Sequence, residues 1–120
     1  MHGAPMITVS FPATPEYLRL ARLATADVGS RAGFDYEEID DLRIAVSELC
    51  SMISGAAEAT LTLDFSFEPA AVTVNGAATP GALSENELSR SIVRAVVDDF
   101  EVTVQDGFAR FQASKRARTR

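Results

Sequence analysis

The chain has 120 residues, of which 47% are hydrophobic and 23% are charged, and its formal net charge is −6. Four of the 11 Lys and Arg residues, and none of the 17 Asp and Glu residues, lie in the last six positions. Seven basic against 17 acidic residues therefore give residues 1–114 a net charge of −10, which disfavours nucleic-acid binding by the fold and favours a basic protein partner. This length and composition predict one globular domain and exclude a disordered chain.

The sequence lacks the usual signals for a membrane or an export route. No apolar run approaches the ~20 residues that cross a bilayer. The first residues, MHGAPMITVSF, have neither the basic region nor the long apolar stretch of a secretory signal. We therefore expect a cytoplasmic protein that does not contact a membrane, and the single Cys50 agrees because it cannot form an internal disulfide. Residues 115–120 (KRARTR) are predicted to form a basic, disordered tail after a domain of residues 1–114.

The first expected elements are a strand and a helix. Residues 6–11 (MITVSF) alternate and are rich in β-branched residues, which predicts a strand that ends at Pro12. Thr14 is then a candidate N-cap, Pro15 suits the first helical position and Glu16 suits the first turn.

This first helix is expected to be amphipathic, with one face that is free to meet a partner. Arg19 and Arg22 point away from the apolar stripe and form, with Glu16, an exposed charged face. We interpret this face as a candidate partner surface, and a merely solvated helix face is the alternative. The apolar stripe consists of Leu18, Ala21, Leu23 or Ala24, and Val28.

A second helix is predicted from Asp35 to the C-cap Gly55. Asp35 followed by Glu38 is a capping-box arrangement, which satisfies two backbone donors at the start of a helix. Glu48 and Asp41 fall on one flank of the apolar arc. The arc itself, which requires a packing partner, consists of Ile39, Leu42, Ala45, Val46, Leu49 and Ile53.

The rest of the chain alternates between hairpins and one helix. Residues 60–67 and 71–75 predict paired strands, residues 76–83 a loop, and residues 100–104 and 108–111 a second hairpin around Asp106-Gly107. Between them Ser84 is expected to cap a helix whose buried stripe consists of Leu88, Ile92, Val93, Val96 and Val97. The order βααββαββ predicts an α+β two-layer sandwich, in which three helices cover one face of a mixed, mostly antiparallel five-stranded sheet.

Few side chains suit catalysis. With only His2 and Cys50 as nitrogen and sulfur donors, we expect no metal site, and no internal histidine is present to activate Cys50 or a serine. Cys50 is interpreted as a buried small residue. The role of Glu48 is left undecided by the sequence. Because it lies on the flank of an apolar face, it could serve as a base or form a hydrogen bond with a loop.

The layout resembles the serine-kinase anti-sigma factors, which belong to the GHKL class of ATP-binding domains. The stretches that carry the resemblance are FPATPEYLRLARL, DDLRIAVSELC and SIVRAVVDDFEVTVQDGFARFQASK, together with the hairpin between the last two. In that family the second helix carries a glutamate that acts as general base. An asparagine four residues later holds the magnesium ion that bridges the phosphates of ATP. Glu48 matches the glutamate.

The resemblance fails at the nucleotide positions. Met52 stands in place of the magnesium-binding asparagine, and a thioether is a poor ligand for a hard cation. Asn75-Gly76 stands where the family has its adenine-binding aspartate, and the short loop before Ser84 leaves no room for the family's ATP lid. We expect a degenerate nucleotide pocket at Glu48, Met52, Asn75 and Gly76, with Glu48 a vestigial base. We therefore expect that the protein binds no cofactor. If the pocket is not degenerate, the expected cofactor is Mg-ATP.

Three functions follow from the resemblance and its failures. The leading hypothesis is a regulator that sequesters a sigma factor or a related transcription regulator. The first alternative is an active serine kinase that phosphorylates an anti-sigma antagonist, with Glu48 as base. The second is a non-catalytic scaffolding subunit whose partner is no sigma factor. The resemblance also implies a homodimer and an antagonist protein as a second partner.

Overall fold

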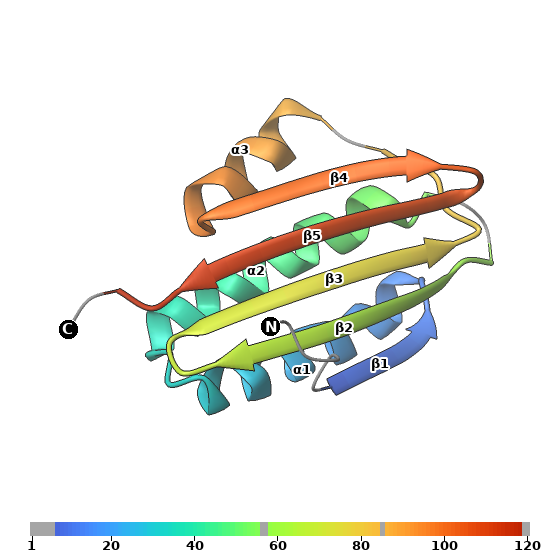
Figure 1. The fold of residues 1–120 in the computed structure, drawn as a ribbon. Helices are drawn as coiled ribbons and strands as arrows, with labels where there is room; N and C mark the ends of the chain where they lie inside the picture. Colours follow the sequence, from blue (N-terminus) through green and yellow to red (C-terminus); the bar gives the residue numbers. More distant parts are fainter. Residues whose placement is uncertain (1–6, 56–57, 85, 119–120) are drawn as a thin grey trace.

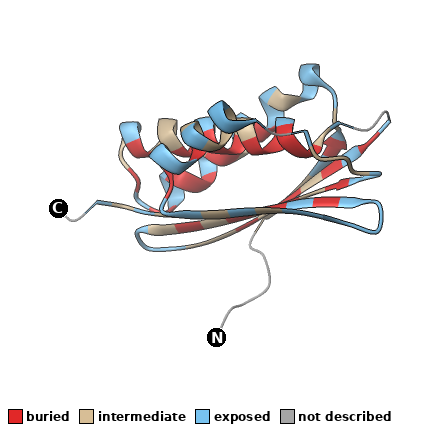
Figure 2. Ribbon diagram, turned by 90° about the horizontal axis from the view of Figure 1, so that it is seen from above, coloured by how far each residue is buried: buried red, intermediate tan, exposed pale blue. Residues whose placement is uncertain are grey.

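The protein is described by a computed structural model that covers residues 7–55, 58–84 and 86–118. The described residues form one five-stranded sheet, three α-helices and a short 3₁₀ helix. All three α-helices lie on one face of the sheet, and no described helix covers the other face, which we call the bare face (Figures 1 and 2). The predicted two-layer α+β sandwich is therefore confirmed. No helix in the described ranges is long and apolar enough to cross a membrane.

The sheet is built entirely from antiparallel pairs. Its strands are β1 (Ile7–Pro12), β2 (Thr60–Glu68), β3 (Ala71–Thr79), β4 (Asp99–Gln105) and β5 (Phe108–Arg116). They lie in the order β1-β2-β3-β5-β4, so β1 and β4 are the edges. The predicted turn at Asp106-Gly107 is confirmed, because Gln105 pairs directly with Phe108.

The helices begin and end close to the predicted positions. A 3₁₀ turn (Pro15–Tyr17) leads into α1 (Leu18–Arg31), and α2 (Tyr36–Ile53) and α3 (Glu87–Val96) follow. The capping box of α2 is confirmed: the Asp35 carboxylate accepts from the Glu38 amide at 2.8 Å, and the Glu38 carboxylate accepts from the Asp35 amide at 2.8 Å. The helix ends at Ile53, with Ser54 as its C-cap, one residue before the predicted Gly55.

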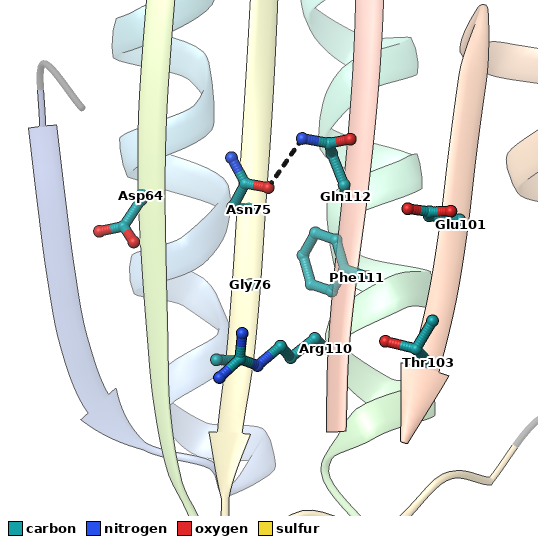
Figure 3. A pocket seen from close by; sticks show the side chains of 9 residues that line it. Asp64, Asn75, Gly76, Glu101, Thr103, Arg110, Phe111 and Gln112 are labelled. Atoms are coloured by element: carbon teal, nitrogen blue, oxygen red, sulfur yellow. Dashed lines mark hydrogen bonds between the residues drawn. The ribbon is translucent and has the colours of Figure 1, made fainter. Parts of the chain in front are cut away.

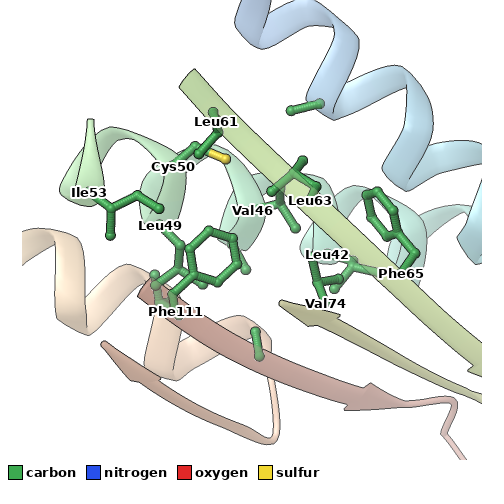
Figure 4. Close-up of a cluster of buried hydrophobic side chains, with 14 of the residues drawn as sticks. Leu42, Val46, Leu49, Cys50, Ile53, Leu61, Leu63, Phe65, Val74 and Phe111 are labelled. Carbon is green, nitrogen blue, oxygen red and sulfur yellow. The ribbon is translucent and has the colours of Figure 1, made fainter. Parts of the chain in front are cut away.

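Helix α2 is the centre of the core. Its buried face packs on the inner face of the sheet, where Leu61, Leu63 and Phe65 of β2 are fully buried (Figure 4). The buried residues of α2 are Glu38, Leu42, Ala45, Val46, Leu49, Cys50, Met52 and Ile53. The predicted arc is thus confirmed except at Ile39, which is half-buried.

Helix α3 differs from its prediction in both its cap and its stripe. The cap is Asn86, whose side-chain oxygen accepts from the Ser89 amide at 2.8 Å, and Ser84 lies outside the helix. Leu88 was predicted to be buried but is 71% exposed. Because the helix starts at Glu87, Leu88 lies in its first turn, while Val93 and Val97 supply the buried contacts.

The predicted boundary between residues 114 and 115 is wrong, because the sheet continues past it. Lys115 and Arg116 belong to β5 and pair with Val72 and Ala71 of β3. The Lys115 ammonium donates to the Val96 carbonyl at 2.8 Å, where it caps the C-terminal end of α3. Arg118 lies 3.0 Å from the Asp35 carboxylate, so the described part of the supposed tail is fixed to the domain. Residues 119–120 lie outside the described residues.

Candidate functional site

The flank of α2 that faces α3 carries the two residues of the predicted base and metal positions. Glu48 is half-buried, and its side chain makes no hydrogen bond or ion pair with any described residue. Met52, one turn later, is only 1% exposed. Asp41 is seven residues before Glu48, on the same flank, and lies 3.8 Å from the Lys115 ammonium. The helix therefore presents one carboxylate next to a thioether that is sealed inside the core.

A short segment between β3 and α3 covers the end of this flank. We call residues 81–84 the strap. The Ser84 amide donates to the Met52 carbonyl at 2.7 Å, and the Gly55 amide donates to the Ala82 carbonyl at 3.3 Å. At its other end the Gly81 amide donates to the Gly107 carbonyl at 2.7 Å. The strap thus ties the C-terminal end of α2 to the β4–β5 turn.

The strap depends on glycine at position 81. A Cβ there would lie 2.2 Å from the Ala109 amide nitrogen, and backbone cannot move aside as a flexible side chain can. We therefore expect Gly81→Ala to lift the strap and to cost about 2 kcal/mol of stability. In amide hydrogen exchange the Ser84 amide should exchange faster in the variant than in the wild-type protein. The Ala70 amide, which is bonded to the Ala32 carbonyl far from the strap, should exchange at the same rate in both. Equal protection of Ser84 in both proteins would contradict this role.

The structure separates the four residues of the predicted nucleotide pocket. In β3 the residues Val72, Val74, Gly76 and Ala78 are buried under the helices, and the residues between them face outward. Asn75 therefore lies on the bare face of the sheet, where its side-chain oxygen accepts from the Gln112 amide at 3.0 Å (Figure 3). The prediction that Asn75 shares a pocket with Glu48 and Met52 is wrong. Of the two β3 residues, only Gly76 is on their side of the sheet.

Gly76 has a packing role at this position. A Cβ on Gly76 would lie 2.2 Å from the ring of Phe111, which is itself 3% exposed. The glycine thus lets the Phe111 ring cross β3 on the inner face of the sheet.

The residues on the flank do not fit a magnesium ion held between this helix and a nucleotide. Magnesium requires oxygen ligands, and the position one turn after Glu48 offers the thioether of a buried Met52. The strap adds a backbone segment whose Ser84 amide donates a hydrogen bond to the Met52 carbonyl itself. Within residues 7–55, 58–84 and 86–118, no group of three or more His, Cys, Asp or Glu side chains is placed to hold a metal.

Comparison with known proteins assigns the family. The sequence pattern of the histidine kinase-like ATPase domain matches residues 11–119, which is nearly the whole chain. The chain belongs to this family.

Relatives within this ATPase-like family include bacterial serine-protein kinases. The chain is 60% identical over 42 residues to the serine-protein kinase RsbW of Listeria monocytogenes, a match that covers 35% of this chain and 27% of that protein. It is 48% identical over 50 residues to RsbW of Bacillus subtilis, which covers 42% of this chain and 31% of the relative. The matches therefore span about a third or less of the relatives' length.

The fold also matches a solved structure. The crystal structure of the RsbU and RsbW domains of a Mycobacterium tuberculosis protein superposes with a TM-score of 0.68 at 15% identity. The match covers 93% of this chain and 33% of the other. At this identity the likeness concerns the fold alone.

The predicted partner face of this ATPase-like domain lies on α1 and the 3₁₀ turn before it. Glu16, Arg19 and Arg22 are all exposed, as predicted. Beside them Leu20 is 46% and Leu23 is 60% exposed. The exposure of Leu20 was not predicted, and the stripe was predicted to contain either Leu23 or Ala24. A signal was present in the sequence: Ala21, Ala24, Thr25 and Val28 form a complete i, i+3, i+4, i+7 stripe that leaves both leucines outside. Because Leu20 and Leu23 are three residues apart on one helix, they form a small apolar patch, which is the feature that marks a candidate protein-binding surface.

The interpretation of Cys50 as a buried small residue is confirmed. Burial raises the pKa of its thiol from 9.0 to about 12, because the interior disfavours the thiolate. At pH 8 the thiolate fraction is then about a thousandfold lower in the folded protein than in the unfolded chain, since three pKa units separate the two states.

Because the thiol is both inaccessible and held protonated, we expect iodoacetamide at pH 8 to label Cys50 at least a thousandfold more slowly in the native protein than in denaturant. Ser51→Cys provides the control, because Ser51 is the exposed neighbour on the same helix and its thiol should react at once. Native labelling of Cys50 at the rate of the position-51 thiol would contradict the buried, neutral thiol.

Proposed function

We propose that this chain is a regulatory binding domain of the anti-sigma type, which holds a sigma factor or a related transcription regulator away from RNA polymerase without using Mg-ATP. Membership of the histidine kinase-like ATPase family and similarity to serine-protein kinase RsbW support the regulatory assignment. The observation that carries the non-catalytic part is the Met52 side chain, apolar and 1% exposed, one turn after Glu48.

The binding part of the proposal rests on α1. Its outer surface combines two exposed leucines, Leu20 and Leu23, with the charges of Arg19 and Arg22. An apolar contact that excludes water and is rimmed by charges provides both affinity and orientation. The acidic body, at −10 for residues 1–114, suits a partner that presents basic surfaces to DNA. We propose a homodimer as the binding unit, which light scattering on the free chain tests directly.

One observation favours a second candidate function. Glu48 is half-buried and has no described partner, so its carboxylate is free to accept a proton from a serine hydroxyl. An active serine kinase that phosphorylates an anti-sigma antagonist would use it as base, with magnesium held elsewhere. A scaffolding subunit with an unrelated partner is the remaining alternative.

The deciding experiment combines binding and transcription. The chain is mixed with each sigma factor of its own genome, and complexes are separated by gel filtration without nucleotide, with Mg-ADP and with Mg-ATP. We expect one sigma factor to form a complex that is equally stable in all three conditions and to lose promoter-specific transcription in proportion to the chain added. Saturable micromolar binding of Mg-ATP in calorimetry, or transfer of labelled phosphate to an antagonist, would overturn the non-catalytic proposal.

The partner surface is tested in the same assay. Leu23→Asp should weaken the complex by tenfold or more, because it places a charge in the apolar centre of the surface. Arg94→Glu is the control, since Arg94 is an exposed residue of α3, away from α1. If no sigma factor binds the wild-type chain, the anti-sigma proposal is wrong and the scaffolding alternative is favoured.

A further inference from the structure

The bare face of the sheet carries a row of polar side chains across four strands. Asp64 of β2 pairs with Asn75 of β3, Asn75 pairs with Gln112 of β5, and Gln112 pairs with Glu101 of β4. These residues share one register, and Figure 3 shows them side by side on the face away from the helices. Three strand spacings of ~4.8 Å place the two carboxylates about 14 Å apart.

A hollow of about 490 Å³ lies along this row. Its floor is low because β3 contributes Gly76, which has no side chain, and Ala77, whose outward side chain is only a methyl group. Arg110 and Thr103, in the next row of the sheet, complete the rim. Glu101, Gln112 and Arg110 are exposed, so the hollow is shallow and cannot enclose most of a small molecule. A larger partner that brings its own surface suits it better.

The charges around the hollow select the partner. On the bare face the described strands β2 to β5 carry four carboxylates, those of Asp64, Glu68, Asp99 and Glu101, against the guanidinium groups of Arg110 and Arg116. A second copy of this chain would bring the same negative excess, and nucleic acid would bring phosphates, so both are disfavoured. A cationic side chain placed near Asp64 or Glu101 is favoured.

The centre of the row offers hydrogen bonds that match a peptide group. Because Asn75 Oδ1 already accepts from Gln112 Nε2, the side-chain nitrogen of Asn75 and the side-chain oxygen of Gln112 remain for a ligand. One donor and one acceptor side by side can bind the carbonyl and the amide of an extended backbone. The carboxylates at the two ends then lie where flanking side chains of that segment would reach.

We propose that this hollow binds an extended, arginine- or lysine-bearing segment of a protein partner, as a second docking surface on the side of the molecule opposite the helices. The segment crosses the strands along the row, with its backbone on Asn75 and Gln112 and its cations on Asp64 and Glu101. This surface is separate from the α1 face and does not depend on the sigma-factor assignment.

The test uses the full chain and a blocked twelve-residue peptide of alternating arginine and threonine. In amide-resolved NMR titrations at low salt, we expect the largest shifts at Asn75, Ala77 and Gln112. The double variant Asp64→Asn, Glu101→Gln keeps the side-chain shapes and should weaken binding at least tenfold. The matched control Glu58→Gln, Glu87→Gln removes the same charge from two exposed sites off the sheet and should change the affinity less than twofold.

Three results would overturn the proposal. The first is an absence of saturable shifts at millimolar peptide. The second is a shift map centred on α1 or on the acidic start of α2. The third is equal weakening in both double variants, which would reduce the effect to net charge. Because no sigma factor is present, these outcomes are independent of the anti-sigma proposal.

Discussion

Replacing Met52 by asparagine is expected to destabilise the protein by about 3 kcal/mol and to leave it unable to bind Mg-ATP. The 1% exposed thioether packs in the core, so asparagine would lose apolar contacts and bury an amide. The substitution restores the residue type of the resembled family's metal position. It does not remove the strap, whose Ser84 amide is bonded to the carbonyl of the same residue. Urea denaturation gives the stability change, and calorimetry gives the nucleotide affinity.

Met52→Leu is the matched control for this prediction. Leucine has a similar volume and no polar atom, so the loss should stay below about 1.5 kcal/mol. A Met52→Asn protein that is as stable as wild type would mean that the side chain faces water. Magnesium-dependent ATP binding by that variant would show that the site lacks only one ligand, and the non-catalytic proposal would lose its main support.

Local patterns in the sequence were sufficient for most of the fold. The Asp35 and Glu38 spacing located the start of α2, because a capping box is formed by residues only three apart. At α3 the same spacing, between Ser84 and Glu87, predicted Ser84 as the cap, and this prediction was wrong. The structure selects Asn86 because residues 81–84 are held by backbone bonds to α2 and to the β4–β5 turn, as at Ser84 and Gly81.

Backbone pairing between residues far apart in the sequence explains why the predicted domain boundary at residue 114 was wrong. Lys115 and Arg116 resemble a solvated tail in the sequence, yet β3 extends to Ala71 and offers them partners more than 40 positions away. At the candidate site, the family resemblance in the sequence predicted a pocket role for Asn75, and the alternation of side chains along β3 places Asn75 on the opposite face. Small residues on the inner face of β3, Gly76 and Ala78, made that alternation hard to see.

Glu38→Ala is expected to cost about 4 kcal/mol, the largest loss among the charged positions considered. Glu38 is fully buried, and its two carboxylate oxygens accept hydrogen bonds from different backbone amides. One accepts from the Asp35 amide at 2.8 Å and starts α2; the other accepts from the Arg118 amide at 2.6 Å and fixes the chain after β5. Hydrogen bonds to a charged acceptor contribute about 1.5–3 kcal/mol each. Both donors would lose their partner in the variant.

Two neighbouring substitutions separate this role from simple charge. The Glu37 side chain is 73% exposed and pairs only with Arg118 at 3.0 Å among the described residues, so Glu37→Ala should cost less than about 1 kcal/mol. Arg118→Ala removes the guanidinium contacts but keeps the amide that donates to Glu38, so it should also cost less than about 1 kcal/mol. Comparable losses at all three positions would mean that the exposed ion pairs, and not the buried carboxylate, join the end of β5 to the start of α2.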